Sequence, residues 1–257
     1  MIYVSHLLED WDMRDVINRT GAGVESIEFS ISENLDCLEE KVDQYEKRLE
    51  EMGCENLILH GPFLDLNPMT FDSLILETTR KRYEQAYWAA KRLGAKKLVF
   101  HTCYVPDVYL LIGWADRVAD FYKRFLESRE GIQIVMENVF DRQAEPILEV
   151  ARKVEHPDFG LCLDMGHAHC YSDRPAGAWA ELFGSYIKHL HVHDNSGDRD
   201  AHWGLGRGNL DYKEIIETVK RNSPDVTFTV ECSQKEDVLH IEAMPEGYNT
   251  YIEQGGS

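Results

Sequence analysis

Short apolar runs rich in β-branched and aromatic residues alternate along the chain with longer segments whose apolar residues recur every three or four positions. The short runs predict strands at residues 2–6, 25–30, 56–60, 97–101, 132–137, 159–164, 187–193 and 226–231. The longer segments predict helices near residues 11–20, 33–52, 71–93, 108–128, 143–154, 175–184, 211–221 and 235–253. Strands separated by helices pair in parallel through right-handed crossovers.

Eight such strand–helix units predict an α/β fold, a (β/α)₈ TIM barrel that forms a single domain over residues 1–257. A barrel of this kind typically needs about 250 residues. The alternative is an open doubly wound sheet, which normally carries a glycine-rich phosphate loop after its first strand. Here that strand is followed by Leu7-Leu8-Glu9-Asp10, so the barrel is favoured.

Composition and charge restrict the partners that we expect. The net charge is -19, which disfavours nucleic acid, because phosphate binding needs many Lys and Arg side chains. We see no signal peptide or membrane span, and the six cysteines form no CxxC pair. We therefore expect a cytoplasmic protein with reduced thiols and no membrane partner. The sequence leaves open whether the protein forms a homo-oligomer.

Residues with metal-ligand side chains end six of the predicted strands. They are His60, His101, Glu137, Asp164, His191 and Glu231. All strands of a parallel barrel open on one face at their C-terminal ends, so these side chains should converge. Burying several carboxylates together is tolerable only if a cation neutralises them. The sequence therefore predicts a site for divalent metal.

Two loops and the seventh strand add further candidates. Asp164-Met165-Gly166-His167 brings a carboxylate and an imidazole to the same rim, and Asp200-Ala201-His202 opens a glycine-rich loop over 200–209. His189, His191 and His193 share one face of the seventh strand, because side chains alternate with a period of two. They cannot all bind one ion. We select His191 as the ligand and place His193 and Asp194 at the rim or behind the ligands.

With these residues in place, the chain resembles the xylose isomerase-like TIM barrel superfamily, from about residue 24 to residue 231. That group includes sugar and sugar-phosphate isomerases and epimerases, and also endonuclease IV, the family 2 abasic-site endonuclease. The motifs that carry the resemblance are LHGPFLDLNP at 59–68, VFH at 99–101, MEN at 136–138, CLDMGHA at 162–168, HVHDNSG at 191–197, DAHWGLGRGN at 200–209 and VEC at 230–232.

The resemblance implies a ligand set and roles. Glu137, Asp164, His191 and Glu231 match the four ligands that both branches share, and in the epimerases Glu137 and Glu231 would also be the catalytic acid/base pair. The further ligands that give the endonuclease three zinc ions are matched by His60, His101, His167, Asp200 and His202. In that scheme Glu137 bridges the ion at His60 and His101 to the shared ion. The other three residues hold the third ion.

Two features bear on the choice between the branches. Phe63 and Leu64 fall where the endonuclease has apolar residues that wedge into DNA, but the basic DNA-contacting segment is not matched, since residues 30–36 contain no Arg or Lys. Many isomerase-like members also keep the Asp-x-His and glycine-rich loop, so the ligand set alone does not make a nuclease.

We therefore expect a metal-dependent isomerase or epimerase of a small sugar, sugar phosphate or related polyol, with proton transfer next to a metal-polarised carbonyl. The alternative is a metal-dependent phosphoesterase of the endonuclease IV type. A non-catalytic binding barrel is disfavoured, because structural metal sites are usually closed. The expected cofactor is zinc or manganese, one to three ions per chain. The expected substrate-binding residues are Phe63, His193 and Trp203.

Overall fold

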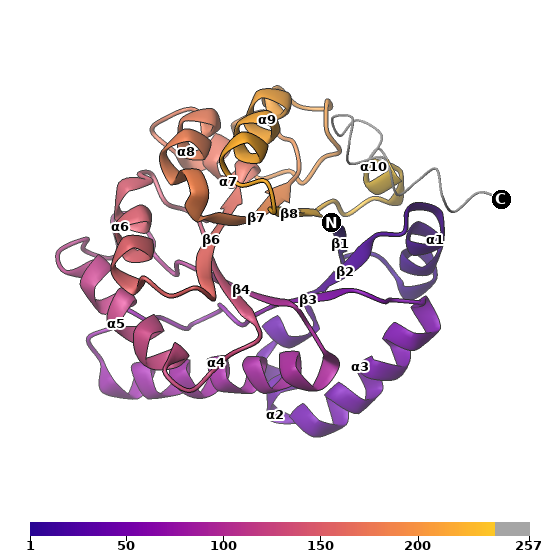
Figure 1. Cartoon of the computed structure of the whole chain (residues 1–257), viewed down its shortest axis with the longest axis horizontal. Helices are drawn as coiled ribbons and strands as arrows, with labels where there is room; N and C mark the ends of the chain where they lie inside the picture. Colours follow the sequence, from indigo (N-terminus) through magenta and orange to yellow (C-terminus); the bar gives the residue numbers. More distant parts are fainter. Residues whose placement is uncertain (240–257) are drawn as a thin grey trace.

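The computed structural model describes residues 1–239. Its strands pair in parallel and in sequence order, and β1 pairs with β8 to close the barrel. Figure 1 looks into this barrel and shows the helices as an outer ring around the strands. The predicted (β/α)₈ fold is confirmed. Within the described residues, no helix is both long and apolar enough to cross a membrane.

The strands lie where the short apolar runs predict them, with small shifts. They are β1 (Ile2–Ser5), β2 (Gly23–Ser26), β3 (Leu57–His60), β4 (Lys97–His101), β5 (Gln133–Glu137), β6 (Phe159–Asp164), β7 (Ile187–Val192) and β8 (Thr227–Val230).

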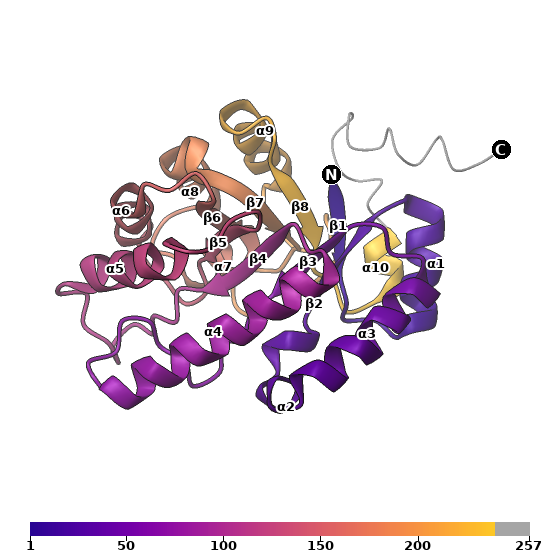
Figure 2. The ribbon, with the colours of Figure 1, turned by 60° about the horizontal axis from the view of Figure 1, so that its bottom comes forward.

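The helices follow the strands around the outside of the barrel, as Figure 2 shows from the side. They are α1 (Asp10–Thr20), α2 (Ser32–Asp36), α3 (Leu38–Met52), α4 (Ser73–Leu93), α5 (Trp114–Leu126), α6 (Glu145–Val154), α7 (Met165–Tyr171), α8 (Ala176–Phe183), α9 (Tyr212–Asn222) and α10 (Lys235–Leu239). Two short 3₁₀ turns are η1 (Glu28–Ser30) and η2 (Gly184–Tyr186).

The interior of the barrel changes from apolar to polar along the strands. Its floor is a separate cluster of buried apolar residues, Tyr3, Ile58, Val99, Val135 and Cys162. Side chains two positions apart point to the same face of a strand. The residues two positions after Ile58, Val99, Val135 and Cys162 are, in that order, His60, His101, Glu137 and Asp164. The strand period therefore places these four ligand-type side chains inside the barrel, at its C-terminal end.

The predicted strand at 25–30 is wrong in its second half. β2 ends at Ser26, and a 3₁₀ turn follows. The Ser26 hydroxyl accepts a hydrogen bond from the backbone N–H of Glu28 at 3.1 Å, and the Ser30 hydroxyl donates to the carbonyl of Ile27 at 2.6 Å. These local serine bonds offer the backbone an alternative to the sheet.

Three predicted helices differ in their bounds from the helices in the structure. The helix at 33–52 divides into α2 and α3 at Cys37, whose ψ of 41° leaves the helical region. The helix at 108–128 begins only at Trp114, because Gly113 adopts a φ of +66°. The first part of the helix predicted at 235–253 is seen as α10, and residues 240–253 lie outside the described residues. Helix α7, directly after β6, was not predicted.

Candidate metal centre

The nine predicted ligand residues gather at the C-terminal end of the barrel, and contacts between their side chains link them into one group, which we call the cup. Its members are His60, His101, Glu137, Asp164, His167, His191, Asp200, His202 and Glu231. The cup divides into three clusters around Glu137, His191 and Asp200. Each cluster offers several nitrogen and oxygen atoms to one position.

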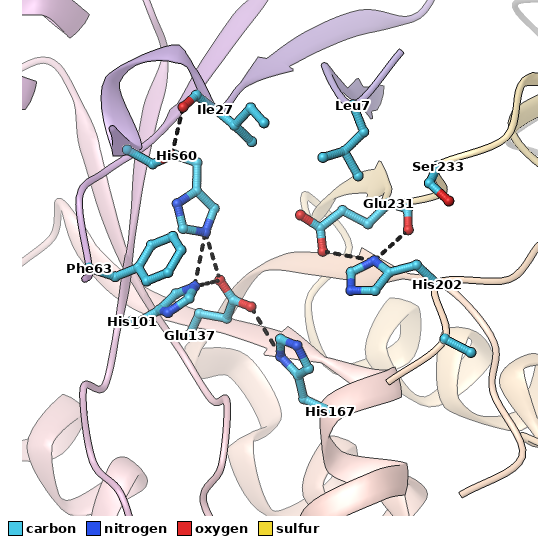
Figure 3. A pocket seen from close by; sticks show the side chains of 12 residues that line it. Leu7, Ile27, His60, Phe63, His101, Glu137, His167, His202, Glu231 and Ser233 are labelled. Atoms are coloured by element: carbon cyan, nitrogen blue, oxygen red, sulfur yellow. Dashed lines mark hydrogen bonds and ion pairs between the residues drawn. The ribbon is translucent and has the colours of Figure 1, made fainter. Parts of the chain in front are cut away.

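The first cluster joins β3, β4 and β5. His60 Nε2 and His101 Nε2 lie 3.1 Å apart, and they approach Glu137 Oε2 at 3.3 and 3.5 Å. Figure 3 shows both imidazoles pointing toward this carboxylate, with Phe63 beside them. The Phe63 ring stacks on His101 with centroids 4.2 Å apart. Three donor atoms facing one point, with apolar support, can hold one cation.

The second cluster is centred on His191 in β7. Its Nδ1 atom lies 3.3 Å from Glu137 Oε1, 3.5 Å from Glu231 Oε2 and 3.7 Å from Asp164 Oδ2. These residues come from β5, β6, β7 and the residue directly after β8. The four ligands that the resemblance assigns to the shared ion therefore surround one position.

The third cluster lies at the rim, where α7 meets the loop after β7. His167 Nε2 and His202 Nε2 approach Asp200 Oδ2 at 3.2 and 2.9 Å. His167 reaches this point because Asp164 caps α7, accepting from the backbone N–H of His167 at 2.7 Å. The α7 helix thus links the second cluster to the third.

Backbone carbonyl oxygens set the tautomers of three histidines. The Nδ1 atoms of His60, His167 and His202 lie 2.9, 3.0 and 2.8 Å from carbonyl oxygens. A carbonyl only accepts hydrogen bonds, so each ring carries its proton on Nδ1. In the neutral form of each ring, Nε2 then carries the lone pair and is directed into the cup. This is how proteins commonly orient metal-binding histidines.

Glu25 in β2 is a candidate site residue that the sequence analysis did not single out. It is fully buried, and its Oε1 accepts a hydrogen bond from His191 Nε2 at 3.0 Å. Its Oε2 accepts from His189 Nε2 at 3.1 Å and also from the Thr229 hydroxyl. The only sequence signal was a glutamate within a predicted buried strand, with no partner near it in the chain.

Asp194, just after β7, holds the glycine-rich loop in place. Its carboxylate accepts hydrogen bonds from the backbone N–H groups of Asn195, Gly206, Gly208 and Leu210, at distances between 2.8 and 3.2 Å. A side chain at Gly208 would put its Cβ 2.1 Å from the carbonyl oxygen of Asn195. The loop that carries Asp200 and His202 is therefore fixed by one buried carboxylate and by a glycine.

Burial and neighbouring charges shift the pKa values of the cup residues in opposite directions. Burial alone would raise the pKa of Glu137, but the imidazoles of His191 and His101 hold this pKa well below its usual value. Burial lowers the pKa of His101 to about 3, against the attraction of Glu137. For His202, burial is outweighed by the Asp200 contact, and the pKa rises to about 9. Anionic carboxylates thus alternate with imidazoles around the cup.

Several polar atoms at the cup lack hydrogen-bond partners although they are buried. They are Glu137 Oε2, His191 Nδ1, His193 Nδ1 and Asp200 Oδ1. Leaving such groups unpaired costs roughly 1–3 kcal/mol each. Divalent cations at the three clusters would give Glu137 Oε2, His191 Nδ1 and Asp200 Oδ1 a partner, and mixed imidazole and carboxylate donors suit zinc or manganese. The residues of the cup therefore fit a metal centre.

A cavity of about 450 Å³ opens above the cup, and residues from all three clusters line it. Its lining includes Glu137 and Glu231 together with apolar side chains from Leu7, Ile27 and Phe63, and Figure 3 shows both carboxylates facing it. Of the three predicted substrate-binding residues, Phe63 lines this cavity. His193 is fully buried behind Asp164, and Trp203 pairs with Asp194 as a short antiparallel bridge.

The fold and the cup define a closed parallel barrel with a cluster of histidine and carboxylate side chains at its C-terminal face. The chain belongs to the xylose isomerase-like TIM barrel family, whose match spans residues 20–250. An uncharacterized protein of Methanocaldococcus jannaschii is 26% identical over 241 residues, which is 87% of this chain and 78% of that protein. A probable endonuclease 4 of Mycobacterium leprae is 23% identical over 74% of this chain and 79% of its own length.

Solved structures share the fold over the whole chain. A D-tagatose 3-epimerase-like protein superposes with a TM-score of 0.78 at 21% identity, covering 100% of this chain and 99% of its own. A Thermus thermophilus protein whose structure comes from soaking with zinc chloride superposes with a TM-score of 0.71 at 23% identity, covering 99% and 97%. At these identities the similarity establishes the fold alone.

Proposed function

We propose that this protein is a divalent-metal-dependent isomerase or epimerase of a small sugar or related polyol. The observation that supports it most is the position of two glutamates. Glu137 ends β5 and Glu231 follows β8, three strands further around the barrel, yet they lie 3.3 and 3.5 Å from the same atom, His191 Nδ1. Both also line the cavity of about 450 Å³. A substrate held there meets a carboxylate on each of two sides.

A bound cation would polarise the substrate's carbonyl group and so make the adjacent C–H more acidic. The protein's own part is proton transfer. One carboxylate takes the proton from the carbon next to the carbonyl, and the other returns a proton to the opposite face. The lowered pKa of Glu137 keeps it deprotonated, as an acceptor must be, but also makes it a weaker base, so proton transfer to it depends on the increased acidity of the C–H group.

The cavity suits a small, uncharged, hydroxylated ligand. Its volume falls within the range of about 300–1,000 Å³ that is usual for small-molecule sites. Among residues 1–239, its lining contains no Lys or Arg that could pair with a phosphate group. Carboxylates and imidazoles can hydrogen-bond to hydroxyl groups, while Leu7, Ile27 and Phe63 supply the apolar surface. We therefore favour a free sugar over a sugar phosphate.

A metal-dependent phosphoesterase of the endonuclease IV type is the second candidate. The presence of all three ligand clusters favours it, because several ions can stabilise both the attacking and the leaving oxygen at phosphorus. The negative charge of the surface argues against this function. The net charge is -19, and the segment after β2 exposes Glu33 and Asp36 instead of basic residues. DNA binding relies on neutralising phosphates with Lys and Arg.

The test is hydrogen exchange with solvent. Metal-loaded protein is incubated with a panel of ketoses and aldoses in deuterated water, and proton signals next to the carbonyl are followed. Deuterium should enter that position of the true substrate. Glu137→Gln and Glu231→Gln should each reduce turnover per bound metal by about 10²-fold or more, while Glu127→Gln on the exposed surface should leave it unchanged. Conversion of a substrate without deuterium incorporation would contradict the proton-transfer mechanism.

A further inference from the structure

A second cavity, of about 800 Å³, adjoins the cavity of about 450 Å³ above the cup. We call the larger one the side cavity and the other the cup cavity. Phe63 and His101 line both of them. The rest of the side cavity belongs to the loops after β3, β4 and β5, and its lining includes Tyr104, Tyr109 and Phe140. The side cavity is therefore the space into which a ligand of the cup cavity would extend.

The side cavity is apolar and aromatic, in contrast to the cup. Tyr109 and Phe140 are 37% and 45% exposed, so they leave aromatic surface in contact with water. Charged residues make up 28% of the chain. Within residues 1–239, however, the lining of the side cavity contains no Lys, Arg or Glu, and its one Asp is Asp65. Such a lining suits an uncharged apolar group and gives a phosphate no partner.

Two loops of the side cavity contain residues in a backbone conformation that favours glycine. Asp65, after β3, has a φ of +60°, and Cys103, after β4, has a φ of +54°. Both residues line the side cavity. A Cβ atom disfavours this conformation, and residues held in it gather at ligand sites. The backbone that shapes the side cavity thus has a feature that is common at binding sites.

We propose that the side cavity binds an aromatic or similarly flat apolar group that is attached to the sugar. The sugar would occupy the cup cavity, and its apolar group would pass Phe63 and pack against Tyr104, Tyr109 and Phe140. Aromatic side chains supply large apolar contact areas to such a group. The volume of about 800 Å³ lies within the usual range for small-molecule sites. A hollow that continues the cup cavity fits part of a small ligand better than the face of a second protein.

This inference rests on the proposed function in one respect, because it takes a sugar as the ligand of the cup cavity. It adds that the substrate is a sugar with an apolar substituent. The substituent takes no part in the proton transfer between Glu137, Glu231 and the substrate. Its binding can therefore be measured separately from turnover.

The test measures binding to the metal-loaded protein by isothermal titration calorimetry. Each aldose and ketose of the panel is offered as a pair of derivatives, which carry a benzyl or a methyl group on the same oxygen. One series of pairs is substituted at the anomeric carbon and the other at the terminal carbon. In at least one pair the benzyl derivative should bind about tenfold more tightly or better, because its ring leaves water for an apolar cavity.

Two variants test whether this preference comes from the side cavity. Tyr109→Ala and Phe140→Ala each remove aromatic surface from its lining, and neither residue belongs to the cup. Each should reduce the preference for the benzyl derivative by about threefold or more and leave the affinity for the methyl derivative unchanged. Ile112→Ala is the matched control, since Ile112 is 84% exposed in the same loop as Tyr109 and lies outside the lining. Elemental analysis checks that each variant keeps its metal.

Three outcomes would overturn the inference. They are equal affinities within every pair, no binding of any pair, and a dimer that dissociates in Tyr109→Ala or Phe140→Ala. Analytical ultracentrifugation detects the dimer, in which a second copy of the chain would cover the side cavity. Tight binding of a benzyl derivative without deuterium exchange would support the inference and contradict the proton transfer alone. Deuterium exchange without a preference for benzyl would contradict the inference alone.

Discussion

Glu25 and His191 meet at the centre of the barrel, where Oε1 of the buried carboxylate accepts a hydrogen bond from Nε2 of the imidazole at 3.0 Å. This contact leaves Nδ1 of His191 facing Glu137, Asp164 and Glu231. Glu25 itself is held by Thr229 and His189. With a cation bound at His191 Nδ1, the arrangement would be a carboxylate–histidine–metal triad, in which the carboxylate fixes both tautomer and ring orientation.

The first prediction concerns this triad. Glu25→Gln keeps the shape of the side chain but loses its charge and one acceptor, so it should weaken metal binding at the His191 position by about 10–100-fold. Competition with a chelator measures the affinity. Glu33→Gln, on the exposed surface, is the control. Unchanged zinc affinity in Glu25→Gln would show that Glu25 does not position His191.

The second prediction concerns the shared metal position. Purified protein should contain at least one zinc or transition-metal ion per chain by elemental analysis. Asp164→Ala and His191→Ala should each lower that content, because each removes a donor from the cluster at His191 Nδ1. Asp198→Ala, which removes an exposed carboxylate in the loop after β7, should not. A protein that stays free of metal after incubation with zinc, manganese and cobalt would contradict the metal centre itself.

The third prediction concerns DNA. The metal-loaded protein should cut a duplex with an abasic site weakly or not at all in moderate salt, since its acidic surface opposes phosphate binding. Gel assays over a series of salt concentrations measure this. Efficient incision that is lost in Glu137→Gln would place the phosphoesterase function first.

The fourth prediction concerns stability at the opposite end of the barrel. Burial lowers the pKa of Lys97, at the start of β4, to about 8. Since an unfolded lysine titrates near 10.4, the unfolded chain binds more protons between about pH 8 and 10.4, and stability rises with pH over that window. Below pH 8 the full cost of burying the charge is present.

Lys97→Met removes that cost, which is at most about 3 kcal/mol, and loses the hydrogen bonds to Gln133 and Lys188. The free energy of unfolding of the variant, relative to wild type, should therefore be greatest at pH 7 and should fall as the pH approaches 10. Urea unfolding at several pH values measures the difference. Lys96→Met, on the exposed surface, should show no such trend. A pH-independent difference for Lys97→Met would contradict the shifted titration.

The amino-acid sequence by itself indicated the architecture and all nine residues of the cup. Strands with a period of two and helices with a period near 3.6 are local properties, and they predicted the barrel and its strand ends. Once the strands are parallel, ligand-type residues at their C-terminal ends must share one face. That is why His60, His101 and Glu137 could be grouped before any contact was known.

Local chemistry also decided details that periodicity alone could not give. Serine hydrogen bonds end β2 at Ser26, where the apolar pattern continues to residue 30. The helix α7 begins at once because Asp164 caps it, although the same residues also resemble a ligand-bearing turn.

Only the tertiary structure showed which atoms meet. Glu25 and His191 are 166 positions apart in the chain, and nothing near either residue indicates the other. By period, His189 and His191 of β7 are equivalent to His193 directly after it. Closure of the barrel nevertheless directs His189 toward Glu25 and His191 toward both Glu25 and the cup, while His193 is held by Asp164 and Gly166. A period fixes the face of a strand on which a side chain lies. The partner that it meets there is set by the neighbouring strands and loops, which come together only when the barrel closes.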